Sequence, residues 1–467
     1  MFSLFDTFSG SLRPLPKTGK PVKLFVCGPT VYDDMHIGHA RTYLAFDILV
    51  RLLRARGYKI NYIQNVTDID DKIIRRAREL KTTPRRLATD FLHRYLADSR
   101  SLGIVSVNKY VKATSVIPVI INQIYRLVHR GFAYATPRGV YFRVKKFKPY
   151  GRLSHQDITT LRSGYRAEPD PGKEDVLDFA LWKKVTVPAE PSWPSPWGKG
   201  RPGWHIEDTA IAEKYFGLQY DLHGGAVDLK FPHHEAEIAQ AESLSGRQPF
   251  VKIWLHTGFL TVSGQKMSKS LHNFVTVADF LKKYHPDVLR WLALNRHYHS
   301  PLNYTSVSAS QSVNSLLSLK SFFAYLDSCR FVSPKRPAVT SALERFTRVW
   351  NESLDSDFNT PEAIAAVFSL VREINTLGVL YRSEAALIKK TLTSRLKEVG
   401  LSIHPSPVPD KVKELISKRE VLRAVRDFRR ADDLRDAIAA LGFRLDDTPS
   451  GPVVVRNDLE ITPLKKL

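Results

Sequence analysis

Short apolar runs alternate with stretches of helical periodicity along the N-terminal part of the chain. Segments 22–26 and 58–66 are rich in apolar, β-branched and aromatic residues, which predicts two buried strands. Between them, apolar residues recur at helical spacing from 37 to about 56, and a second helix is expected after Thr67. Strands that alternate with helices in this way favour a parallel sheet covered by helices.

The rest of the chain is predicted to contain several segments that differ in secondary structure. We expect a helix near 117–130 and a strand at 139–144, and then renewed α/β character over 204–260. A strongly helical region should follow over 306–401. The tail is predicted to hold one basic helix from 411 to about 442 and then a short β-like end.

Composition and charge narrow the possible partners and surroundings. The 467 residues carry a formal net charge of +23, which points to a polyanionic partner such as nucleic acid, unless the whole source proteome is basic. Two cysteines are too few for a disulfide framework and fit a reducing compartment. No run approaches the ~20 apolar residues that span a bilayer, and we find no leader-like or dimerisation segment, so we expect a cytoplasmic monomer without membrane contact.

A histidine pair marks the turn between the first predicted strand and the first predicted helix. His36 and His39 lie where the helix N-terminus offers N–H groups and a positive dipole end to an anion. Gly38 between them leaves room for a nucleotide, and imidazoles can donate hydrogen bonds to phosphoryl oxygens. The alternative is that both histidines only cap the helix.

A lysine-containing loop supplies a second candidate phosphate contact. Lys266 and Lys269 lie in the Ser/Gly/Lys-rich segment 263–270, which could close over a triphosphate with two ammonium groups. A solvated basic turn is the alternative for this segment taken alone. The histidine pair upstream favours a phosphate clamp.

Three further residues form a candidate metal site. His233 and Glu237 are spaced i,i+4 and therefore share one face of a predicted helix, and Cys27 ends the first predicted strand. Thiolate, imidazole and carboxylate are all zinc ligands. A surface His/Glu pair is the alternative.

The histidine and lysine motifs, in this order, resemble the two signatures of the class I aminoacyl-tRNA synthetases. A more specific likeness, to cysteinyl-tRNA synthetase, runs from about residue 2 to residue 455 and lies in five segments: 25–33, 65–73, 177–183, 203–207 and 231–237. The resemblance implies an α/β fold in which a Rossmann-type parallel-sheet catalytic domain with a connective insertion precedes a helical bundle and a small α+β domain. The predicted segments are 1–106 and 201–260 for the catalytic domain, 107–200 for the insertion, 261–305 for the lysine loop and stem-contact region, 306–404 for the bundle, and 405–467 for the anticodon-binding domain.

The resemblance also implies a zinc ion at the floor of the amino-acid pocket. Its ligands would be Cys27, His233, Glu237 and residue 208, which is Asp208 here where the family has a second cysteine. Thiolate and carboxylate carry the same charge, but carboxylate oxygen is harder and moves the preference toward harder metals. Three outcomes stay open: a working zinc site, an altered or weakened metal site with activity retained, and a lost metal.

The implied reaction is the ATP-dependent attachment of cysteine to tRNA(Cys), with Mg²⁺ accompanying ATP. His36, His39, Lys266 and Lys269 would stabilise the triphosphate, with Gly38 beside the nucleotide. By resemblance, the remaining roles fall to Thr67 and Trp204 in the amino-acid pocket and to Asp228 at the ribose hydroxyls. Taken alone, Trp204 could equally be a core residue and Asp228 a turn residue.

The arginine-rich segment 411–444 resembles the family's anticodon-reading domain, although a solvated charged helix is the simpler alternative. The family often has an aromatic residue after the motif at 447–451, whereas this chain has Val453, Val454 and Val455, so base stacking there is in doubt. Two other functions stay open: a catalytically decayed tRNA-binding paralogue and a cysteine ligase that acts on an amino-sugar.

Overall fold

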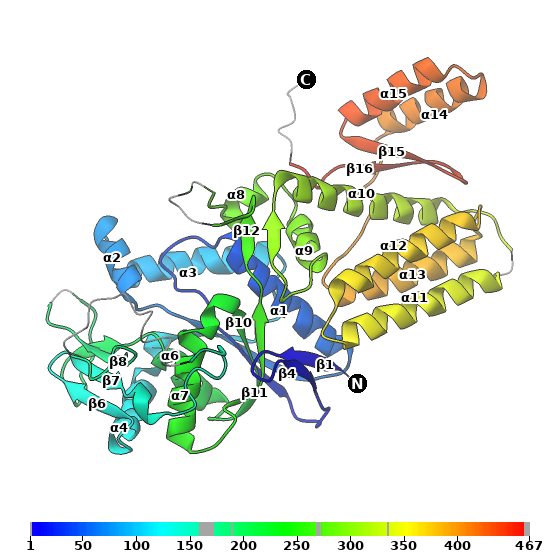
Figure 1. Cartoon of the computed structure of the whole chain (residues 1–467). Helices are drawn as coiled ribbons and strands as arrows, with labels where there is room; N and C mark the ends of the chain where they lie inside the picture. The colour runs from blue at the N-terminus through cyan, green and yellow to red at the C-terminus, as the bar shows by residue number, and fades with distance from the viewer. Residues whose placement is uncertain are drawn as a thin grey trace. The chain divides into compact units, whose positions relative to one another are not determined.

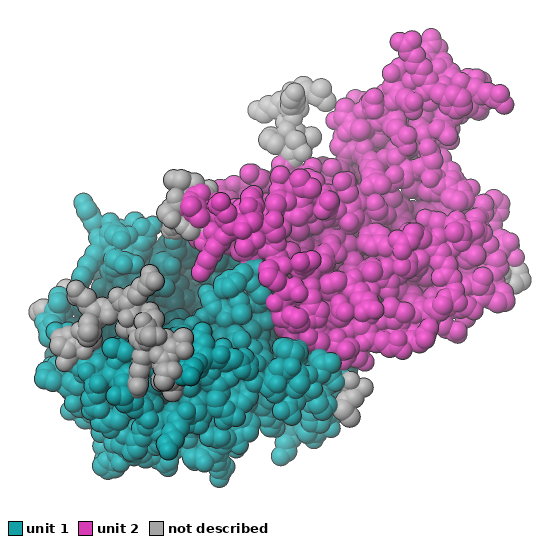
Figure 2. Space-filling model, in the orientation of Figure 1, with its two compact units in different colours: residues 1–259 teal, residues 260–467 magenta. Residues whose placement is uncertain are grey.

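The computed structural model describes residues 2–157, 172–187, 190–267, 271, 273–333 and 336–461. The chain divides into two compact units, Met1–Phe259 and Leu260–Leu467, which we call the first and second unit (Figure 2). Within the described ranges, every helix is too short or too polar to cross a lipid bilayer. The finer division into six segments stays a prediction.

A five-stranded parallel sheet lies at the centre of the first unit, in the order β11-β10-β3-β4-β5 (Figure 1). Its strands are β3 (Val22–Val26), β4 (Ile60–Val66), β5 (Lys109–Lys112), β10 (Tyr220–Ala226) and β11 (Val251–Thr257). The helices are α1 (Ile37–Ala55), α2 (Asp71–Glu79), α3 (Pro84–Ser101), α4 (Ile117–His129), α6 (Ile206–Tyr215) and α7 (His233–Ser245), with short 3₁₀ turns η1 (Ala113–Val116), η2 (Val144–Lys146) and η3 (Val227–Lys230). The predicted parallel sheet with interleaved helices is confirmed.

Two antiparallel elements complete the first unit. A four-stranded sheet in the order β6-β7-β8-β9 contains β6 (Ala133–Thr136), β7 (Gly139–Phe142), β8 (Phe179–Lys184) and β9 (Gly200–Pro202). The chain also begins with a hairpin of β1 (Ser3–Asp6) and β2 (Ser11–Pro14), which the hydrophobic pattern did not predict. Both hairpin strands are only four residues long, and all four residues of β2 are exposed, so they leave no apolar run.

The position of Cys27 follows from the alternation of side chains along β3. Phe25 and Cys27 are two residues apart and both enter the core that contains Ile211 of α6 and Ala236 of α7. Gly28 lets the chain continue past β4, because a Cβ at this position would lie 1.8 Å from the backbone oxygen of Asn65. The end of β3 therefore places the thiol beneath helices α6 and α7.

The second unit joins a small sheet to a set of helices. Strands β12 (Leu260–Val262), β13 (Gln265–Lys266) and β14 (Leu302–Tyr304) pair in the order β13-β12-β14. The helices that follow β13 are α8 (Val277–Leu281), α9 (Pro286–Leu294), α10 (Ser306–Ser328), α11 (Pro337–Asp355), α12 (Thr360–Thr376) and α13 (Arg382–Glu398). The strongly helical region predicted over 306–401 is confirmed.

The prediction of one basic helix from 411 to about 442 is wrong. The segment forms two helices, α14 (Asp410–Ala424) and α15 (Phe428–Ala440), followed by a hairpin of β15 (Phe443–Thr448) and β16 (Gly451–Arg456). The break occurs because Arg426 takes a left-handed conformation with φ of 62° and Asp427 caps α15 by accepting a hydrogen bond from the Arg430 N–H. The predicted β-like end is the hairpin.

We predict that Arg419→Ala destabilises this C-terminal hairpin by about 1–3 kcal/mol. The Arg419 side chain is fully buried and donates to both carboxylate oxygens of Asp447 at 2.8 and 2.9 Å, so its loss removes packing and a bidentate pair. Amide hydrogen exchange of β15 and β16 in the full chain would measure the change. Arg423→Ala is the control, because the Arg423 side chain is 40% exposed and its guanidinium lies 3.7 Å from the same carboxylate. Equal effects of the two variants would contradict the prediction.

Candidate metal centre and active site

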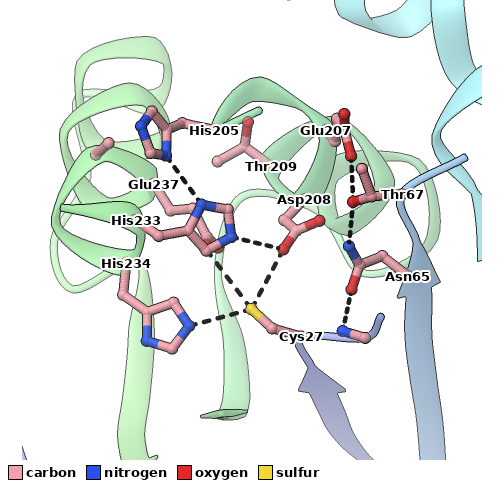
Figure 3. A network of polar contacts seen from close by, with 12 residues as sticks. Cys27, Asn65, Thr67, His205, Glu207, Asp208, Thr209, His233, His234 and Glu237 are labelled. Carbon is pink, nitrogen blue, oxygen red and sulfur yellow. Dashed lines mark hydrogen bonds and ion pairs between the residues drawn. The ribbon is translucent and has the colours of Figure 1, made fainter. Parts of the chain in front are cut away.

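Four buried side chains from three elements converge at the carboxyl end of β3 (Figure 3). Cys27 follows β3, Asp208 lies in the first turn of α6, and His233 and Glu237 occupy successive turns of α7. The i,i+4 spacing read from the sequence therefore places both α7 side chains on the face that meets Cys27. The structure brings together all four ligands that the resemblance implied.

The atoms that face one another are within reach of a shared ion. Asp208 Oδ2 lies 3.2 Å from Cys27 Sγ and 3.1 Å from His233 Nε2. Glu237 Oε1 lies 3.3 Å from His233 Nε2 and 3.9 Å from Cys27 Sγ. Sulfur, nitrogen and two carboxylate oxygens at such separations form a set of donors suited to zinc.

The electrostatics of this cluster favour a cation. Burial raises the pKa of the Cys27 thiol well above its ordinary value, and Asp208 raises it further. The pKa of Glu237 is raised for the same two reasons. Asp208 Oδ1 and Glu237 Oε2 are buried and have no hydrogen-bond partner among the residues that the structure describes. A divalent cation would compensate both the crowded negative charge and the unsatisfied oxygens.

Further histidines surround the thiol and were not anticipated as site residues. His234 Nε2 lies 3.1 Å and His223 Nε2 3.4 Å from Cys27 Sγ. His234 Nδ1 in turn lies 2.8 Å from His256 Nε2, and His256 Nδ1 lies 2.9 Å from the hydroxyl of Thr7. Burial lowers the pKa of His256 to about 3 and those of His223 and His234 well below the ordinary value, which keeps the rings neutral. We call His223, His234 and His256 the histidine layer. The adjacent histidines at 233 and 234 were the one signal in the sequence that pointed to it.

The two residues expected in the amino-acid pocket border the metal-ligating group. The ring of Trp204 stacks on His233 with centroids 4.2 Å apart, and its side chain is 37% exposed, so Trp204 is not a core residue. Thr67 is buried and donates to Glu207 Oε2 at 2.7 Å. Burial and the neighbouring Asp208 raise the pKa of Glu207, whose part in this network the sequence did not reveal.

The phosphate motifs fall in both units. His36 caps α1 by accepting a hydrogen bond from the His39 N–H at 3.2 Å, and the two rings stack with centroids 3.5 Å apart. Burial lowers the pKa of His36 to about 4, despite the opposing effect of Asp33. Gly38 lies in the first turn of α1, and Asp228 is exposed in η3. In the second unit, Lys266 ends β13, and Lys269 lies outside the described residues.

Comparisons with known proteins identify the chain's relatives. Residues 15–314 match the family model "tRNA synthetases class I (C) catalytic domain", and residues 349–401 match the "DALR domain" model. A cysteine–tRNA ligase of Thermococcus onnurineus is 43% identical over 461 residues, which cover 94% of this chain and 95% of the relative. The chain belongs to the cysteine–tRNA ligase family. A family member from Coxiella burnetii is 42% identical over 450 residues, which cover 93% and 95% of the two chains.

Solved structures confirm the fold class of this family member. Methionyl-tRNA synthetase of Mycobacterium tuberculosis, in complex with methionyl-adenylate, superposes with a TM-score of 0.60 at 16% identity. The match covers 81% of this chain and 89% of that one. The class I synthetase fold expected from the sequence is therefore correct, and the buried group at Cys27 is consistent with the family's zinc site.

We predict that Asp208→Asn weakens metal binding at this group more than the ~10–100-fold typical of losing a supporting residue outside the ligand shell. The amide keeps the shape of the side chain but loses its charge and its ligating carboxylate. Metal content per chain after dialysis against a weak chelator would measure the effect. Glu207→Gln is the matched control, because Glu207 is an equally buried neighbouring acid outside the metal-ligating group. Unchanged metal content in Asp208→Asn would refute the assignment.

We also predict acid destabilisation through His256. Its pKa of about 3 in the folded chain lies below the ordinary value of 6.5, so the unfolded chain binds more protons between these values and stability falls as pH falls. Lowering the pH from 7 to 5 should cost about 2 kcal/mol from this residue. Urea denaturation at both pH values should show a smaller decrease for His256→Gln, and the wild-type decrease for His129→Gln, which changes an exposed histidine. Identical decreases in all three proteins would rule this source out.

Proposed function

We propose that this chain activates cysteine with ATP and transfers it to tRNA(Cys), using the buried group of Cys27, Asp208, His233 and Glu237 to hold zinc. The observation that carries the proposal is the convergence of these four donors, two of them with unsatisfied buried oxygens, in a family of cysteine–tRNA ligases. When bound there, zinc would supply a Lewis-acidic position for a thiolate.

Selection for a thiol explains why a metal centre suits this site. Cysteine and serine differ by sulfur against oxygen, and shape alone separates such near-isosteres by only ~10–200-fold. A thiol ionises far more readily than a hydroxyl group, so a soft, cationic centre prefers cysteine. Asp208 keeps the charge of the ligand set while replacing a soft donor with a hard one, and we propose that thiol selection survives this exchange.

Trp204 and Thr67 are proposed to position the amino acid beside the metal. Trp204 stacks on a ligand and remains partly exposed, so one side of its ring can face a substrate. Thr67 is held by Glu207 through a 2.7 Å hydrogen bond, and Glu207 adjoins Asp208 in α6. The hydrogen bond would therefore fix Thr67, in the wall of the amino-acid pocket, relative to the metal ligand Asp208.

The nucleotide contacts are proposed from the two motifs. His36 and His39 would donate hydrogen bonds to phosphate oxygens at the N-terminus of α1, next to Gly38, and Lys266 and Lys269 would add positive charge. Asp228, exposed in η3, would accept hydrogen bonds from the ribose hydroxyls. Mg²⁺ would accompany the ATP.

The reaction then needs no covalent enzyme intermediate. A carboxylate oxygen of cysteine attacks the α-phosphorus of ATP and pyrophosphate leaves. A ribose hydroxyl of the terminal adenosine of tRNA next attacks the carbonyl carbon of the adenylate, and AMP leaves. The protein contributes orientation and charge stabilisation.

The C-terminal helices are proposed to contact the tRNA. Exposed apolar side chains at Val421, Val425 and Phe428 lie among arginines of α14 and α15, which suits a ligand with both phosphates and bases. Val453, Val454 and Val455 are buried in the hairpin, so none of these three side chains offers a surface on which a base could stack. A monomeric, cytoplasmic enzyme remains our prediction.

The test is ATP–pyrophosphate exchange with cysteine and with serine, followed by transfer to tRNA(Cys). We expect exchange with cysteine alone, and a fall of about 10²–10³ in rate for His39→Asn, because one donor to the developing phosphate charge is lost. His93→Asn, which changes an exposed histidine on α3, should leave the rate unchanged.

Each of the other possible results would indicate a different function for this chain. Comparable exchange with serine would mean that Asp208 has removed thiol selection. Exchange with cysteine but transfer only to an amino-sugar would contradict the tRNA ligase, and no exchange at all would leave a tRNA-binding paralogue.

A further inference from the structure

A second group of metal-type side chains lies in the second unit, and none of its three residues is among those to which we assigned a part in the reaction. His297 and His299 lie in the segment between α9 and β14, and Asp357 lies in the connection from α11 to α12. Their ligand atoms all lie within 4.8 Å of one another. The two imidazole centroids are 4.2 Å apart.

The distances from the two imidazoles to the Asp357 carboxylate are compatible with ligands that share one ion. His297 Nε2 lies 3.7 Å and His299 Nε2 3.6 Å from the same oxygen, Oδ2 of Asp357. Both distances exceed the range of N–H···O hydrogen bonds. Two atoms that are each about 2.1 Å from a zinc ion, at angles near the tetrahedral value, lie about 3.4 Å apart. The observed separations of 3.7 and 3.6 Å are close to this value, so one cation fits between the two nitrogens and the oxygen.

The surrounding residues fix the carboxylate. Tyr298, between the two histidines, donates to the other oxygen of Asp357, Oδ1, at 2.8 Å. The buried Tyr298 ring stacks on Phe358 at 4.2 Å and 15°. Asp357 and Phe358 both have left-handed backbones, with φ of 56° and 33°, a conformation that is retained only where packing enforces it. This supporting hydrogen bond leaves Oδ2 directed at the imidazoles, as supporting residues do at metal sites.

We propose that His297, His299 and Asp357 bind a divalent transition-metal ion of the zinc type, separate from the group at Cys27. Two nitrogens and one oxygen suit zinc, cobalt or nickel, whereas magnesium and calcium prefer oxygen ligands alone. The His299 side chain is 46% exposed, so water can complete the coordination. The ion would tie the segment before β14 to the α11–α12 connection. β14 pairs with β12, and β12 pairs with β13. By holding the segment before β14, the ion would therefore stabilise the small sheet that carries Lys266.

The experiment titrates Zn²⁺ into the full chain against a chromophoric chelator and counts the equivalents bound. Cys27→Ser weakens the first group, so an equivalent that remains in Cys27→Ser and is lost on the further change His299→Gln reports the second. We expect one equivalent in Cys27→Ser and its loss in Cys27→Ser/His299→Gln. His285→Gln is the matched control, because His285 is similarly exposed at 47% and lies 3.5 Å from a carboxylate oxygen of Asp287, but it has no second histidine beside it.

Cobalt gives an independent readout of the ligands. Co²⁺ at the second group should show no sulfur-to-metal charge transfer in Cys27→Ser, while its ligand-field bands disappear on His299→Gln and persist on His285→Gln. Retention of the zinc equivalent in Cys27→Ser/His299→Gln, or its absence from Cys27→Ser, would overturn the proposal. Neither measurement depends on aminoacylation, so a failure here is distinct from a failure of the proposed function.

Discussion

The first unit is organised around the burial of acidic groups beside one thiol. Asp208 and Glu237 carry carboxyl groups that ionise in neutral water, yet here they lie beside the Cys27 thiol, beneath two helices and away from solvent. Burial, and after it the neighbouring Asp208, raises the pKa of Cys27 and of Glu237. The same packing leaves carboxylate oxygens unsatisfied, which is costly in a low-dielectric interior. A bound cation would offset each of these penalties. The stability of the packing of α6 and α7 over these side chains therefore depends on whether a cation occupies the site.

The histidine layer extends this constraint outward from the metal-ligating group. His223 and His234 contact the thiol, and His256 links His234 to Thr7 in the hairpin loop at the start of the chain. Because these rings are kept neutral by burial, each can hold its neighbour by a defined hydrogen bond without adding charge. A short hairpin with little core of its own therefore contributes to the rigidity of the site.

In the second unit, some arginine side chains are buried in ion pairs and others are exposed to solvent. The Arg419 side chain is buried against Asp447 and holds the terminal hairpin, whereas Arg423 and Arg430 remain exposed on the helices. The cations behind the whole chain's net charge of +23 therefore include both buried side chains that hold the fold together and side chains exposed to solvent. Buried and exposed arginines occur in the same segment, because the burial of each side chain depends on whether its face of α14 meets the hairpin.

Local pattern was enough to predict β3, α1 and β4, because apolar spacing over a short window sets strand and helix directly. The motifs around His36, Cys27 and His233 also identified the family from residue identity alone, and they named the four candidate metal ligands that the structure brings together. Pattern could not predict the break at Arg426, which depends on one backbone conformation and a capping aspartate. It also could not bring His223, His256 or Glu207 to the site, since each lies in a buried segment whose neighbours come from distant strands and helices. Sequence determined the chemistry available at this centre, and only the tertiary structure decided which groups share one low-dielectric volume, because that choice depends on long-range packing.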